Sequence, residues 1–102
     1  MIPKTLPRKV KVGDKWYSVE IMEAMKNKNE AGRVYYDKQL IELGKRSYHG
    51  IPLRMHAIHE TFWHELVHAI LHDMEEHKLN DREKFVEDFA YRLYKAIRSA
   101  RF

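Results

Sequence analysis

The sequence predicts an α+β fold, in which a small sheet of three or four mostly antiparallel strands packs on a buried helix and on a second, C-terminal helix. Three observations predict it. Glycine and proline fall before residue 53, apolar residues alternate with polar ones in that first half, and apolar residues recur at helical spacing in the second half. We therefore expect one domain over residues 1–102, with a strand-and-loop half at 1–52 and a two-helix half at 53–102.

Four segments are expected to form the sheet, because they alternate apolar with polar residues or are rich in β-branched and aromatic residues. They are residues 8–12, 15–21, 33–37 and 39–44. Gly13-Asp14 separates the first two segments, which predicts a tight hairpin turn. Residues 22–31 fit either a helical turn or a long loop, and residues 45–52 are expected to be a loop.

A long helix is expected from Leu53 to about Met74, because neither glycine nor proline interrupts this stretch. Its wide apolar stripe predicts a central helix rather than a surface one. The stripe comprises Ile58, Phe62, Trp63, Leu66, Val67, Ala69, Ile70 and Leu71. Asn80 or Asp81 is a suitable N-cap for a last helix through Arg98. The core residues expected of that helix are Phe85, Val86, Phe89, Ala90, Leu93 and Ile97.

Composition and charge exclude several classes of protein. The 102 residues are 44% hydrophobic and 33% charged, which is typical of a globular chain, and the absence of cysteine excludes disulfides and thiolate metal sites. No apolar run approaches the roughly 20 residues of a membrane span, and the N-terminus lacks the apolar segment of a signal peptide. We therefore expect a cytoplasmic protein with no membrane partner.

The net charge of +4 is unevenly distributed along the chain. Residues 1–55 carry 12 basic and 6 acidic side chains, whereas residues 56–102 carry 7 and 9. A basic first half would suit an acidic partner, but no nucleic-acid-binding motif accompanies it. We expect a solvated, lysine-rich sheet surface, and nucleic acid is not expected as a partner.

The long helix carries His64-Glu65-Leu66-Val67-His68, which is the pattern H-E-x-x-H. Residues i and i+4 of a helix share one face about 6 Å apart along the axis, so both imidazoles can bind one Zn²⁺ ion. Glu65 borders that face without occupying a ligand position, which suits a general base acting on water. The alternative is a polar stripe facing solvent, or core histidines satisfied by hydrogen bonds. A buried helix favours the metal site, because burying unpaired polar groups costs several kcal/mol.

A catalytic zinc site needs a third protein ligand, which the motif does not supply. Glu83 in the last helix is the first candidate, and Glu87, one turn later, is placed to orient a ligand histidine from the second shell. Asn80-x-x-Glu83 also fits a capping box, in which Glu83 would cap the helix rather than bind an ion.

Three further residues near the motif carry side chains that can bind a metal ion. His72 continues the row of histidines but lies two turns from His64, about 12 Å along the axis, so a second-shell or structural role is expected for it. Glu76 and His77 lie in the connector between the helices. They remain the alternatives to Glu83 as third ligand.

The segments FWHELVHAILH and EKFVEDFAYRL resemble the small phage and prophage zinc metallopeptidases of the ImmA/IrrE type, within the gluzincin group. In that family a second helix follows H-E-x-x-H, with a glutamate and then a polar residue before Phe-Ala. Glu83, Glu87 and Phe89-Ala90 stand in that order, although the family often has Asn or Asp in the place of Glu87. The resemblance implies a minimal zincin-like peptidase, and members similar to ImmA act on phage-type repressors.

We therefore expect a zinc-dependent endopeptidase with Glu65 as general base, Zn²⁺ as cofactor and a protein or peptide as substrate, which the resemblance extends to a phage-type repressor. The substrate is expected to bind extended along an edge strand at residues 39–44. The alternatives are a catalytically silent zinc-binding interaction or structural domain and a basic nucleic-acid-binding protein. The residue that stabilises the oxyanion is left open among His59, His72, Tyr48, Tyr91 and Tyr94.

Overall fold

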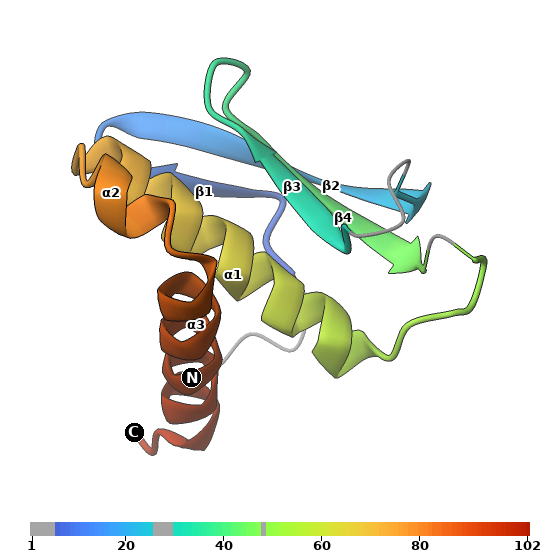
Figure 1. The fold of residues 1–102 in the computed structure, drawn as a ribbon. Helices are drawn as coiled ribbons and strands as arrows, with labels where there is room; N and C mark the ends of the chain where they lie inside the picture. The colour runs from blue at the N-terminus through green and yellow to red at the C-terminus, as the bar shows by residue number, and fades with distance from the viewer. Residues whose placement is uncertain (1–5, 26–29, 48) are drawn as a thin grey trace.

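A four-stranded sheet lies against one side of a long central helix, and the last helix packs against another side of it (Figure 1). The computed structural model describes residues 6–25, 30–47 and 49–102. The elements, in chain order, are β1 (Lys9–Val12), β2 (Lys15–Ala24), β3 (Gly32–Tyr35), β4 (Leu40–Arg46), α1 (Met55–Asp73), α2 (His77–Asn80) and α3 (Glu83–Ser99). The predicted α+β class is confirmed, and the short helix α2 is an addition to it.

The sheet is mixed, with the strand order β1-β2-β4-β3. The pairs β1–β2 and β3–β4 are antiparallel, whereas β2 and β4 run parallel. Because β4 pairs on both sides, β3 and β1 are the edge strands. The expectation that residues 39–44 form an edge strand is therefore wrong, since the period-2 pattern of a strand is the same whether it has one neighbour or two.

The first hairpin turns at Gly13, as predicted, and its geometry requires glycine. Gly13 has φ of +60°, and a Cβ atom there would lie 2.5 Å from Oδ2 of Asp73 at the end of α1. Strand β2 then continues through Ala24, three residues beyond the predicted end. Residues 22–24 therefore extend a strand rather than forming a helical turn, while residues 26–29 lie outside the described part of the chain.

Helix α1 has two apolar faces, which explains its wide apolar stripe. One face packs on the sheet, where Phe62, Leu66 and Ala69 meet the fully buried Ile41 and Leu43 of β4. The other face packs on α3 through Val67 and Leu71, which meet Val86 and Ala90. Among the described residues, no helix has both the length and the apolar character needed to cross a membrane.

Two residues expected in the core, Ile70 and Phe89, are exposed instead. Ile70 is 38% exposed, because at 100° per residue it falls between the face of α1 that meets the sheet and the face that meets α3. Phe89 is 47% exposed and stacks on Phe85 at the flank of α3, with ring centroids 5.7 Å apart. Helix α3 buries the neighbouring row of Val86, Ala90 and Tyr94.

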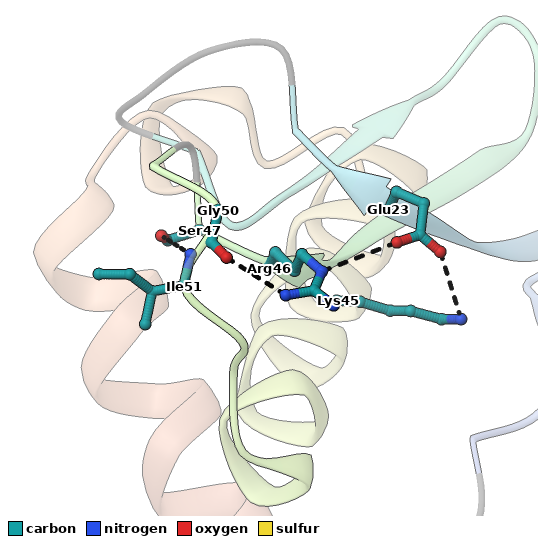
Figure 2. A network of polar contacts seen from close by, with 6 residues as sticks. All are labelled: Glu23, Lys45, Arg46, Ser47, Gly50 and Ile51. Carbon is teal, nitrogen blue, oxygen red and sulfur yellow. Dashed lines mark hydrogen bonds and ion pairs between the residues drawn. The ribbon is translucent and has the colours of Figure 1, made fainter.

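A group of exposed polar contacts ties the end of the sheet to the loop before α1 (Figure 2). Glu23 at the end of β2 pairs with Lys45 Nζ at 3.7 Å and with Arg46 Nε at 3.8 Å. Arg46 Nη1 in turn donates a hydrogen bond to the carbonyl oxygen of Gly50 at 3.3 Å. Each exposed ion pair contributes about 1 kcal/mol or less, so the group positions the loop more than it stabilises the fold.

Candidate metal centre

The two histidines of H-E-x-x-H share a third face of α1. They lie one turn apart, and the ring centroids of His64 and His68 are 4.9 Å from each other. This face borders the strip that packs on the sheet and leaves both imidazoles partly exposed, with side-chain exposures of 24% and 13%. The helix therefore presents two nitrogen donors towards one point, as the spacing predicted.

Glu83, the first residue of α3, places its carboxylate across both histidines. Its Oε2 lies 3.3 Å from Nε2 of His64, and its Oε1 lies 2.6 Å from Nε2 of His68. One candidate ligand atom from each of the three residues lies within 4.8 Å of the others. The residues predicted as metal ligands are thus brought together, although they come from two helices and are separated by fifteen positions in the sequence.

The donor set fits zinc. Two histidines and a glutamate are one of the ligand sets of catalytic zinc in peptidases, with ligand bonds of about 2.0–2.2 Å. Two ligands at tetrahedral angles around such an ion lie about 3.3 Å apart, which is the spacing of His64 and Glu83. The contact between Nε2 of His68 and Oε1 of Glu83 is shorter, at 2.6 Å, so an ion bound by both atoms would require them to move apart.

Burial favours the neutral, metal-binding form of His64. Loss of solvent lowers the pKa of its imidazole, and this effect outweighs the nearby Glu83 carboxylate, which raises it. Zinc binds imidazole only in its deprotonated form. A pKa below its ordinary value therefore favours metal binding by His64 at neutral pH.

Glu65 is a buried carboxylate beside the three ligand residues. Only 8% of its surface is exposed, and burial raises the pKa of its carboxyl group to about 7, against the opposing effect of His68. A divalent cation at the neighbouring ligands would lower that pKa again. A carboxyl group with a pKa near neutrality is suited to exchanging protons at neutral pH.

Asn80, which the sequence offers as an N-cap of the last helix, contacts His68 instead. Its Oδ1 lies 2.6 Å from Nδ1 of His68, and its Nδ2 donates a hydrogen bond to Oη of Tyr36 at 3.1 Å. The capping-box interpretation is therefore wrong. Asn80 ends α2, and the N-cap of α3 is Arg82, which makes no capping hydrogen bond with its side chain.

The remaining candidates surround the three ligand residues without joining them. The ring of His72 stacks on Tyr36 at a centroid distance of 3.9 Å and contacts His77 at 5.5 Å. Glu87 is exposed on the wall of the cleft, and its charge raises the pKa of His64. Glu76 is the N-cap of α2. In the part of the chain that the structure describes, the side chain hydrogen-bonded to a ligand histidine from behind is that of Asn80, not of Glu87.

The three ligand residues and Glu65 line an open cleft of about 940 Å³. Its walls are α1, α3 and the edge strand β3. Gly32 brings β3 close to α1, since a Cβ atom there would lie 2.6 Å from Cγ2 of Thr61. Glycine at this position therefore allows an edge strand to lie beside the metal centre.

The proposed oxyanion donors separate into three groups. Tyr91 lines the cleft, whereas His59 and Tyr94 are buried and stack on each other at 6.2 Å. His72 lies behind Tyr36, and Tyr48 is outside the described residues. Of the candidates that the structure describes, Tyr91 is the one that lines the cleft.

Comparisons of this chain with protein-family models, with curated proteins and with solved structures found no match.

Proposed function

We propose that the protein is a zinc-dependent endopeptidase. The observation that carries the proposal is the convergence of His64, His68 and Glu83 in an open cleft, with the buried carboxyl group of Glu65 beside them. A structural zinc site is normally closed by a fourth protein ligand, whereas a catalytic site keeps one position open. Among the described residues, the group able to hold an ion offers three ligands and no fourth. A cytoplasmic location is part of the same proposal.

Each residue has a defined role in this reaction. His64, His68 and Glu83 would hold the ion, which when bound polarises a carbonyl group and makes water more acidic. Glu65 accepts a proton from the attacking water and passes it to the nitrogen of the leaving amine. Its burial and its place in the cleft wall beside His64, His68 and Glu83 support this role.

The substrate is proposed to be a peptide that lies extended along β3. Gly44 N donates to Ala31 O, so by the alternation of an antiparallel ladder the N–H groups of Gly32 and Val34 point away from β4 towards the open edge. An extended peptide can pair with such an edge through its backbone, largely independently of its side chains. A phage-type repressor as the protein substrate is supported only by the resemblance of the two helical motifs.

The test combines metal analysis with hydrolysis of an unfolded protein substrate. Protein purified without added metal should contain close to one equivalent of zinc, and chelation should abolish hydrolysis while the fold is retained. Glu65→Gln should keep the zinc but slow hydrolysis by about 10²–10⁴-fold, which is the range for loss of a general base. Glu60→Gln is the matched control, because it removes another carboxylate of the same cleft wall on the same helix.

Three outcomes would contradict the proposal. Less than about a tenth of an equivalent of zinc, with no uptake at micromolar concentrations, would remove the metal site. Loss of zinc in Glu65→Gln would make Glu65 a ligand. Bound zinc with no hydrolysis of any unfolded protein or peptide would assign the chain to the catalytically silent zinc-binding domains.

A further inference from the structure

His68 has a hydrogen-bond acceptor at each of its ring nitrogens. Oε1 of Glu83 lies 2.6 Å from Nε2, and Oδ1 of Asn80 lies 2.6 Å from Nδ1. A neutral imidazole has only one N–H group, so the two acceptors compete for it. The ring binds an ion through Nε2 only when the proton is on Nδ1.

The orientation of the Asn80 amide decides this competition. With its oxygen towards His68, the amide accepts from Nδ1–H and leaves the lone pair of Nε2 for an ion. After a 180° flip, its NH₂ group would face Nδ1 and stabilise the opposite tautomer. Asn80 is buried, with 9% of the residue exposed, so whichever group faces away from His68 also needs a partner.

Tyr36 supplies that partner from a different part of the fold. Its hydroxyl group accepts a hydrogen bond from Nδ2 of Asn80 at 3.1 Å. The ring follows β3 directly and is stacked on His72, with the two ring planes 7° from parallel. The hydroxyl therefore has a position fixed by packing between the sheet and α1.

We propose that Asn80 and Tyr36 are positioning residues that hold His68 in the tautomer able to bind the ion. The inference rests on the metal centre of the proposed function and adds a set of contacts that controls its affinity for the ion. His72 belongs to the same set of contacts, because its ring stacks on that of Tyr36 and holds it in place. Three residues that are not ligands, namely Tyr36 just after β3, Asn80 in α2 and His72 in the last turn of α1, thus act on one ligand nitrogen.

The arrangement predicts that the two residues are coupled in a particular way. Asn80→Asp replaces the amide by a carboxylate, which accepts from Nδ1–H through either oxygen and cannot stabilise the wrong tautomer. A carboxylate partner also raises the basicity of a ligand histidine, so this variant should bind zinc at least as tightly as the parent chain. Tyr36→Phe removes the fixed hydroxyl but keeps the stacked ring. It should weaken zinc binding about 10–100-fold in the parent chain, the range for supporting partners of metal ligands.

The experiment is a double-mutant cycle on zinc affinity, measured by competition with a chelator. Tyr36→Phe should lose its effect in the Asn80→Asp background, where the change in affinity should fall below about threefold. Tyr35→Phe is the matched control, because the neighbouring tyrosine points to the opposite face of β3, with Arg33 and Lys38 over its ring. It should leave zinc affinity within about twofold of the parent.

A second readout reports the tautomer itself. In the zinc-loaded protein, the Nδ1–H proton of His68 should give a slowly exchanging NMR signal, which should exchange faster in Tyr36→Phe and recover in Tyr36→Phe combined with Asn80→Asp. Circular dichroism of each variant checks that the fold is kept. A merely structural role for Tyr36 would not be rescued by a change at Asn80.

The outcomes separate this inference from the proposed function. If the parent chain binds one zinc ion and Tyr36→Phe resembles Tyr35→Phe, the positioning role is overturned and the metal centre stands. An equal loss of affinity from Tyr36→Phe in both backgrounds also overturns it, because the tyrosine would then act through packing alone. If the parent chain binds no zinc, both proposals fail.

Discussion

Two faces of α1, the apolar face towards the sheet and the polar face with His64 and His68, differ in the kind of contact that holds their side chains in place. The face towards the sheet is a continuous apolar surface, where Phe62 and Leu66 meet Ile41 and Leu43 and every neighbour contributes to the same packed core. The face with His64 and His68 depends on single contacts, each made by one atom to another. We infer that changes on the first face reduce stability by degrees, while changes on the second remove a function and leave the fold.

The largest effect on stability is expected from Phe62→Ala. Phe62 is 4% exposed between α1 and the sheet, so truncation leaves a cavity and should lower the free energy of unfolding of the metal-free protein by about 3–5 kcal/mol. The folded fraction should still bind zinc with nearly unchanged affinity. Urea denaturation and zinc titration of the same variant measure both quantities.

Ile70→Ala is the matched control for that prediction, as an aliphatic truncation on the same helix. Because Ile70 is exposed, its truncation should lower the free energy of unfolding by about 1 kcal/mol or less. If the two variants were equally destabilised, it would be incorrect that Phe62 lies on the sheet-facing side of α1 and Ile70 outside it.

Glu83→Gln tests the other face and should produce the largest loss of metal affinity. The substitution replaces a carboxylate by a neutral amide of the same length, so zinc binding should weaken by more than about 100-fold, beyond the range for residues that only support a ligand. Glu83 is 65% exposed at the side chain, and the unfolding free energy of the metal-free protein should change little. Zinc titration decides the point, and full affinity would show that Glu83 is not the third ligand.

The sheet-facing half of this comparison was largely predictable from the sequence. Alternation located the first two strands, and apolar, β-branched and aromatic content located the other two. The absence of glycine and proline predicted almost the full length of α1, with 55–73 observed against 53–74 expected. These features depend on local patterns that each strand or helix carries in its own residues. The order of the strands does not depend on such local patterns. Because β2 pairs with β4, the open edge lies at β3 and not at residues 39–44 as expected.

The histidine-bearing face was predictable only in part. His64, Glu65 and His68 follow from their spacing on a helix, and Glu83 from the need for a third ligand. Asn80 and Tyr36 do not, because their contacts depend on how a four-residue helix and the end of an edge strand come together in space. The Asn80-x-x-Glu83 spacing pointed to a helix cap, a local interpretation that the tertiary contact with His68 overrides.

Val34→Pro tests whether the open edge of β3 takes part in substrate binding. The N–H group of Val34 points away from β4, so proline there should preserve the sheet ladder, as proline does on edge strands. If a substrate carbonyl accepts from that amide, kcat/KM should fall about 2–12-fold, the equivalent of one hydrogen bond of about 0.5–1.5 kcal/mol. Zinc affinity should not change.

Arg33→Pro provides the contrast to Val34→Pro. By the same alternation, the amide of Arg33 points towards β4, so proline at this neighbouring position should break the ladder and destabilise the sheet. An unchanged rate in a folded, zinc-loaded Val34→Pro variant would mean that the substrate does not pair with this strand.

Glu87→Gln should have the smallest effect, although Glu87 lies one helical turn after Glu83, the proposed third ligand. Its carboxylate is exposed and acts on His64 through charge, and it is the smallest of the influences named for the pKa of that imidazole. The interaction of an exposed charge with a neighbouring group contributes about 1 kcal/mol or less, so zinc affinity should fall by no more than about fivefold. Asn80→Leu, which removes a buried hydrogen bond to His68, should lower zinc affinity about 10–100-fold. A larger loss in Glu87→Gln than in Asn80→Leu would show that the second carboxylate of α3 orients a ligand histidine when zinc is bound, and that the amide from α2 does not.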